Sequence, residues 1–253
     1  MPIDDWATAV LWRLYASVML NCTGTPLVVT FDLFSALLDS RTGGSAAFDQ
    51  LAGRGGWQVS GKQLYDGWDR RNKAGQRNCD AWVPWRVLAV RALTETYASL
   101  EVDGDAVADV EELVESMAGW PLWPDVADGL SVMGDQFRVG LLSNVDDEVF
   151  RRTAAATLVN PELAFTSEWL RIYKPHAAIY IRAVEQAGSL VQLVHVATSA
   201  RDVRGALEAE IPVVRLRRRG HELDPDGPRP TYEASRVGEL PDVLAHVLAG
   251  LRR

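Results

Sequence analysis

Apolar residues follow two patterns along this chain, one typical of buried strands and one of helices. Four short runs of aliphatic and β-branched residues predict strands buried on both faces: residues 27–31, 138–142, 193–196 and 211–216. Apolar residues at helical spacing lie between these runs: Val126, Leu130 and Met133; Ile179 and Ala183; Val203, Ala206 and Leu207. Because strands and helices alternate, we predict an α/β fold with a parallel sheet covered on both faces.

The segment from about residue 45 to 119 has a different pattern, without a convincing strand. Its apolar residues keep helical spacing in three stretches: Leu64 and Trp68; Trp85, Leu88, Ala89, Ala92, Leu93 and Tyr97; Val107, Val110, Val114 and Met117. Pro121 and Pro124 then mark the return to the sheet region. We therefore predict a helical insertion over residues 45–119, within a core formed by residues 27–44 and 120–253.

Composition and charge narrow the class of protein. A chain of 253 residues with 47% hydrophobic and 24% charged residues is long enough for one core plus an insertion. A net charge of -8 argues against nucleic acid as a partner, because phosphate binding needs a basic face. The local basic run at Arg215 and Arg217–Arg219 is interpreted as a solvated strand end.

The cysteines and the N-terminal residues indicate the cellular compartment in which the protein is expected. Cys22 and Cys79 cannot form a disulfide framework, and no Cys/His cluster has the spacing of metal ligands, so we expect a reducing, cytoplasmic compartment. Residues 1–26 are predicted to be an N-terminal extension, since Asp4 and Asp5 stand where a signal peptide would be basic. No apolar run approaches the roughly 18 residues of a membrane-spanning helix, and no membrane partner is expected.

Polar residues stand directly after the predicted strands. Asp32 follows the first strand, and Ser143 and Asn144 follow the second. In open α/β sheets, ligands bind at the carboxyl ends of the strands. A single polar residue at a strand end is common, but several at one sheet edge predict a binding or catalytic site.

Four segments, in order, resemble the four motifs of haloacid dehalogenase superfamily hydrolases. They are residues 31–40, Leu-Leu-Ser-Asn at 141–144, Tyr-Lys-Pro at 173–175 and Ala-Thr-Ser-Ala-Arg-Asp at 197–202. The resemblance covers residues 27 to about 244. It implies a Rossmann-like parallel sheet core with a helical cap domain inserted after the first strand, and an active site between core and cap.

The resemblance also implies roles for five residues. Asp32 would be the nucleophile, because a carboxylate can form a covalent intermediate without a cofactor. Lys174 would keep Asp32 ionised. Ser143 and the backbone around Asn144 would donate hydrogen bonds to an anionic substrate, and Asp202 would orient Lys174 or a hydrolytic water.

Departures from the motifs favour one branch of this superfamily. Phosphatase members carry a second aspartate two residues after the nucleophile and Gly-Asp in the fourth motif, whereas this chain has Phe34 and Ala197-Thr198. A phenyl ring cannot transfer a proton, and a magnesium site without the carboxylate of the fourth motif loses a hard oxygen ligand. The 2-haloacid dehalogenases look more similar, since they carry an aromatic residue at the position of Phe34, a tyrosine at that of Tyr180, and need no metal.

Three other positions do not match the dehalogenases. The cap arginine that would receive halide or carboxylate is replaced by Asp69, which leaves Arg70 and Arg71 as the candidates for substrate binding. Ala36 replaces a hydroxyl residue that would orient the nucleophile. Ser199 replaces an asparagine and is a further candidate for substrate contact.

Three hypotheses stay open on the sequence. The first is a metal-independent, dehalogenase-like hydrolase without a cofactor that acts on a small anionic substrate, a 2-halocarboxylate. The second is a phosphatase with altered acid/base chemistry, which would need Mg²⁺. The third is a divergent member that binds without catalysis. The oligomeric state is left open, a homodimer included.

Overall fold

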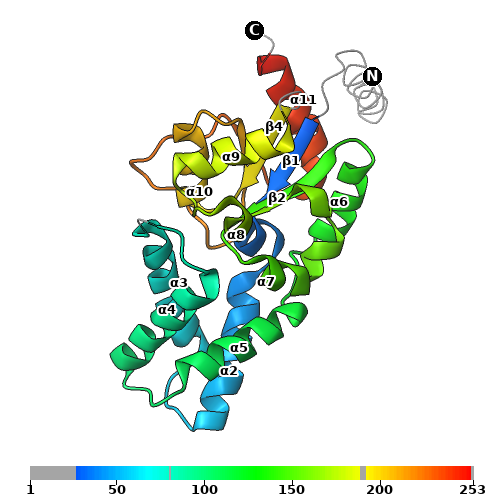
Figure 1. The fold of residues 1–253 in the computed structure, drawn as a ribbon. Coiled ribbons are helices and arrows are strands. Elements are labelled where there is room, and N and C mark those ends of the chain that lie inside the picture. Colours follow the sequence, from blue (N-terminus) through cyan, green and yellow to red (C-terminus); the bar gives the residue numbers. More distant parts are fainter. Residues whose placement is uncertain (1–26, 80, 189–191, 252–253) are drawn as a thin grey trace.

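A single parallel sheet forms the centre of the structure. The computed structural model describes residues 27–79, 81–188 and 192–251 (Figure 1). The strands are β1 (Leu27–Phe31), β2 (Arg138–Ser143), β3 (Ala164–Thr166), β4 (Gln192–Ala197), β5 (Val213–Leu216) and β6 (Tyr232–Ala234), and their order across the sheet is β3-β2-β1-β4-β5-β6. Every pair of neighbours is parallel, so the predicted α/β core is confirmed. The extension predicted for residues 1–26, with Cys22, lies outside the described residues.

The four strands predicted from apolar runs are all present in the sheet. The first has the predicted bounds, and the others differ by at most two residues at either end. β3 and β6 were not predicted. Each has three residues and lies at an edge of the sheet, which is too short for a run or an alternation to be recognised.

Helices cover the two faces of the sheet. α6 (Val126–Gly134) and α11 (Leu240–Leu251) pack in one hydrophobic core with Val29 and Phe31 of β1. α9 (Ala177–Ala187) and α10 (Ala200–Glu208) pack in a second core with Val28. Because successive side chains of a strand point to opposite faces, β1 contributes to both cores. Two shorter helices, α7 (Asp147–Arg152) and α8 (Ser167–Leu170), follow β2 and β3.

Four of the helices that lie between β1 and β2 form a separate group in Figure 1. A π-helical turn, η1 (Leu33–Leu37), leads from β1 to α2 (Ser40–Gly55), α3 (Gly61–Arg77), α4 (Trp85–Leu100) and α5 (Ala106–Ser116), and η2 (Met117–Gly119) ends the group. α2 begins five residues before the predicted start at 45. Val107, which keeps the helical spacing of α5, is 62% exposed, whereas Leu113 on the same helix is buried.

Hydrogen bonds from the core hold the N-terminal end of α4. The carboxylate of Asp146, which follows β2, accepts from the backbone N–H of Trp85 at 2.9 Å and of Arg86 at 3.2 Å. The Tyr173 hydroxyl donates to the carbonyl of Val83 at 2.7 Å. The inserted helices are thus fixed close to the carboxyl ends of the strands. None of the helices in the described ranges is long and apolar enough to cross a membrane.

Candidate active site

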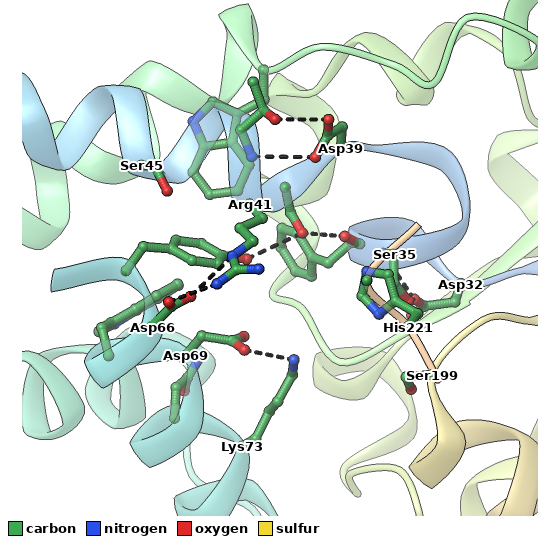
Figure 2. Close-up of a pocket in the computed structure, with 18 of the residues that line it drawn as sticks. Asp32, Ser35, Asp39, Arg41, Ser45, Asp66, Asp69, Lys73, Ser199 and His221 are labelled. Atoms are coloured by element: carbon green, nitrogen blue, oxygen red, sulfur yellow. Dashed lines mark hydrogen bonds and ion pairs between the residues drawn. The ribbon is translucent and has the colours of Figure 1, made fainter. Parts of the chain in front are cut away.

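Asp32 lies at the carboxyl end of β1 and is held by hydrogen bonds to both of its oxygens. It caps the N-terminal end of η1, where Oδ2 accepts from the Ser35 backbone N–H at 3.1 Å and from Ser35 Oγ at 2.6 Å (Figure 2). Oδ1 accepts from Lys174 Nζ at 2.8 Å and from Ser143 Oγ at 3.3 Å. The carboxylate is buried, at 8% exposure, and still lines a pocket.

Lys174 joins Asp32 to Asp202. Its Nζ donates to Asp32 Oδ1 at 2.8 Å, to Asp202 Oδ2 at 2.6 Å and to the carbonyl of Leu142 at 2.9 Å, which uses all three N–H groups. Burial raises the pKa of Asp32, but the charge of Lys174 and the hydrogen bonds from Lys174 and Ser35 outweigh it, so that the pKa lies below its usual value. Burial lowers the pKa of Lys174, and the two carboxylates more than compensate. All three groups are therefore charged at neutral pH.

Two further side chains form hydrogen bonds with the carboxylate of Asp202. Tyr180 donates to Oδ1 at 2.7 Å, and His195 Nε2 lies 3.1 Å from Oδ2. The other ring nitrogen of His195 lies 3.1 Å from Thr30 Oγ1. Burial raises the pKa of Asp202, whereas Lys174 and His195 lower it, with a net shift below the usual value. His195 was not predicted from the sequence, where its only signal was a polar residue within the apolar run of β4.

Asn144 holds the backbone of Lys174. Its Oδ1 accepts from the Lys174 N–H at 2.7 Å, and its Nδ2 donates to the Lys174 carbonyl at 3.0 Å. Nδ2 also donates to Oε1 of Gln76 on α3 at 2.9 Å. Asn144 thus positions Lys174 and contacts the inserted helices, and Gln76 is a second site residue that the sequence did not reveal.

A pocket of about 890 Å³ separates the ends of the strands from the inserted helices. Ligand pockets commonly measure about 300–1,000 Å³, so this one can hold more than a three-carbon acid. One wall is aromatic: Phe34, Tyr65, Trp68, Trp85, Trp120 and Trp123. The ring of Phe34 stacks on that of Trp85, with centroids 6.1 Å apart and planes 15° apart. This wall suits an apolar group of a substrate.

Opposite charges on the inserted helices neutralise one another. Arg41 and Lys62 pair with Asp66 at 2.7 and 3.0 Å, and Lys73 pairs with Asp69 at 2.6 Å (Figure 2). Asp69 stands where the resemblance implies an arginine. Its pairing with Lys73 leaves this part of the pocket without a free positive charge for a substrate anion.

The structure does not bring every expected substrate contact to the pocket. Phe34 and Ser199 line it, whereas Tyr180 lies behind Asp202. Neither Arg70 nor Arg71 lines it: Arg70 is exposed, and Arg71 donates to the carbonyl of Gly67. The pocket face of α3 consists of residues at helical spacing, namely Lys62, Tyr65, Asp66, Trp68, Asp69, Asn72, Lys73 and Gln76. Positions 70 and 71 lie on the other side of the helix because each residue turns it by about 100°.

Ser35 supplies the hydroxyl that Ala36 cannot. The resemblance places a hydroxyl residue four positions after the nucleophile, and Ala36 is fully buried there. Ser35 instead donates to Asp32 through both its N–H and its Oγ. The signal in the sequence was the spacing Asp-x-x-Ser, in which an N-cap aspartate accepts from the third residue after it. Loss of the hydroxyl at 36 therefore leaves Asp32 oriented.

The donor set does not fit a magnesium ion. Lys174 occupies the space between Asp32 and Asp202 and bonds to one oxygen of each, while Tyr180 and His195 bond to Asp202 from behind. The side chain of Phe34, where a phosphatase carries a carboxylate, offers no oxygen ligand. In the described part of the chain, no three His, Cys, Asp or Glu side chains are grouped so that they could hold a metal ion.

Gly205 allows α10 to approach the segment that carries Lys174. A Cβ at this position would lie 2.7 Å from the Tyr180 hydroxyl and 2.8 Å from Cβ of Pro175. We expect Gly205→Ala to lower the free energy of unfolding by about 1–3 kcal/mol, because α10 must move away from Pro175. Urea denaturation measures the change.

The matched control is Gly53→Ala on α2, where an added Cβ meets no atom within 4 Å. This variant should be as stable as the parent protein or slightly more stable, since alanine favours a helix over glycine. Equal stability of both variants would contradict the close approach at Gly205.

Comparison with known proteins supports the fold. No family model and no curated protein matches the chain. Among solved structures, it is similar to a defluorinating L-2-haloacid dehalogenase, with a TM-score of 0.73, 22% identity, and 90% of this chain and 96% of that chain covered. It is also similar to the L-2-haloacid dehalogenase from Xanthobacter autotrophicus with chloropropionic acid covalently bound, with a TM-score of 0.71, 17% identity, and 87% and 98% covered. The chain has the haloacid dehalogenase (HAD) fold.

One of the similar structures was solved with magnesium bound. The HAD-type protein YfnB of Bacillus subtilis, solved bound to magnesium, matches with a TM-score of 0.68, 15% identity, and 87% of this chain and 99% of that chain covered. At such identities the likeness establishes the fold, and chemistry has to be argued from the site. The pocket lies between the inserted helices and the carboxyl ends of the strands.

Proposed function

We propose that this protein is a metal-independent hydrolase that forms an aspartyl ester on Asp32, with a 2-halocarboxylate as substrate. The observation that carries the proposal is the ion-paired group of Asp32, Lys174 and Asp202 next to Phe34. Asp32 is held ionised and faces the pocket, as a nucleophile requires. Phe34 stands where the leaving alcohol of a phosphate ester would need a proton donor.

Two displacement steps account for the reaction. An oxygen of Asp32 bonds to the substrate carbon while the carbon–halogen bond breaks, and the halide leaves with the bonding electrons. Water then attacks the carboxyl carbon of the ester, which releases a 2-hydroxycarboxylate and a proton and regenerates Asp32. Asp202 lines the same pocket and is our candidate for orienting this water. Lys174 lies between both carboxylates and stabilises their negative charge.

Metal dependence distinguishes a dehalogenase-like reaction from a phosphatase-like one. We expect chelator to leave halide release from a 2-chlorocarboxylate unchanged, because none of the steps needs a Lewis acid. Halide release is measured with and without chelator, and phosphate release from an aryl phosphate with and without added Mg²⁺. Chelator-sensitive phosphate release that disappears in Asp32→Asn would replace this proposal with the phosphatase alternative.

A further inference from the structure

Arg201 has a positive charge in the pocket wall without a carboxylate partner. It lies in the first turn of α10, directly before Asp202, and is half-buried. Its guanidinium donates to the carbonyl of Lys73 at 2.8 Å and to Oε1 of Gln76 at 3.2 Å. Both acceptors belong to α3 and are uncharged. No acidic side chain of the described ranges pairs with Arg201, although it lines the pocket.

Four other cations of the pocket do have acidic partners. Arg41, Lys62 and Lys73 pair with Asp66 and Asp69, and Lys174 pairs with Asp32 and Asp202. Arg219 also lines the pocket without such a pair, but it is exposed to solvent. A half-buried guanidinium without a counterion is costly, since burial takes it partly out of water. Burial lowers the pKa of Arg201, and nearby Arg77 lowers it further, against the opposite effect of Asp202. An anion entering the pocket would offset this cost.

The free donors of Arg201 suit a carboxylate. A guanidinium has five N–H groups in one plane, and the two hydrogen bonds to α3 use two of them. The remaining three can form the paired bonds that arginine makes with a carboxylate. The bonds to Lys73 and Gln76 hold the plane in place, which reduces the entropy lost when a ligand binds.

We propose that Arg201 binds the carboxylate of the substrate while an apolar group of the substrate packs on the aromatic wall formed by Phe34, Trp85 and Trp120. The inference rests on the proposed function, since it assumes that a carboxylate reacts at Asp32. It assigns the anion-binding role to the core helix α10, in place of the cap position where Asp69 pairs with Lys73. The substrate class is a 2-substituted carboxylic acid with an apolar side chain.

Binding of a matched pair of probes tests this role without turnover. The acid 3-phenyllactate resembles the 2-hydroxycarboxylate product, and its amide has nearly the same shape without the charge. By calorimetry, we expect the wild-type protein to bind the acid more tightly than the amide. Arg201→Gln should weaken binding of the acid by about 10- to 100-fold, because a charge-assisted pair is lost, and leave binding of the amide unchanged. Arg201→Lys, which keeps the charge, should retain a preference for the acid.

The control is Arg204→Gln, the same substitution one turn later on α10, where the arginine is exposed and pairs with Glu208 at 2.7 Å. It should bind both probes as the wild type does. Equal losses for acid and amide in Arg201→Gln would mean that Arg201 only holds α3 against the core, and equal affinities for both probes in the wild type would contradict the proposal. Acid binding that depends on Arg201 in a protein without halide release would preserve this inference and refute the proposed reaction.

Discussion

Replacement of Asp32 by asparagine is expected to abolish turnover, by at least about four orders of magnitude in kcat, because the amide is not a nucleophile. The side chain keeps its shape and can still accept from Ser35, so the fold should be retained. Steady-state halide release measures the loss, and circular dichroism with thermal unfolding confirms that the variant is folded.

The matched control for this substitution is Asp128→Asn on the exposed surface of α6. It removes the same charge from a residue that does not line the pocket, and its kcat should equal that of the wild type. An Asp32→Asn protein that retains a rate within about tenfold of the parent would refute the assignment of Asp32 as nucleophile, since loss of a covalent nucleophile has much larger effects.

Lys174→Met is expected to inactivate the protein and to destabilise it by about 3–5 kcal/mol at neutral pH, since two buried carboxylates lose their common counterion. With Lys174 present, the pKa of Asp32 lies below its usual value. Without Lys174, burial alone would raise that pKa above the value of the unfolded chain. The acidic limb of any remaining activity should therefore move to higher pH.

The free energy of unfolding should depend on pH in the direction that these pKa shifts set. In the wild type, the lowered pKa values of Asp32 and Asp202 stabilise the fold above the unfolded pKa, and this contribution is lost as the pH falls through the folded values. In Lys174→Met, the raised pKa of Asp32 stabilises the fold below the pKa of the unfolded chain. This contribution is lost as the pH rises through the folded pKa. The difference in unfolding free energy between the two proteins should therefore narrow as the pH falls. An unmoved acidic limb and a constant difference would contradict the pairing.

Local sequence patterns predicted the core and Asp32, and the resemblance to a family predicted the rest of the charged group. The apolar runs were enough to locate the four longest strands, because strands buried on both faces leave few polar residues in the sequence. Asp32 follows β1 and Ser143 ends the neighbouring parallel strand β2, and the carboxyl ends of parallel strands meet at one edge of a sheet. The resemblance added Lys174 and Asp202, and the structure places both within hydrogen-bonding distance of each other.

Contacts between segments distant in sequence could not be predicted in this way. The rotation of α3, which turns Asp69 and Gln76 to the pocket and Arg70 away from it, depends on how the helix packs against α2 and α4. The contacts of Arg201 with α3 span more than 120 residues, and no local pattern encodes them. His195 was missed because a single polar residue within a strand does not reveal its partner, here Asp202 on α10.

A single turnover in water labelled with heavy oxygen tests the central claim, an ester on Asp32, most directly. With protein in excess over a 2-chlorocarboxylate, water that attacks the ester places the label in the carboxyl group of Asp32, while the product hydroxyl takes its oxygen from the unlabelled protein. Mass spectrometry of the peptide that contains Asp32 should therefore show one heavy oxygen, and the first product should show none. Label in the product and none in Asp32 would mean that water attacks the substrate directly, and would contradict the account.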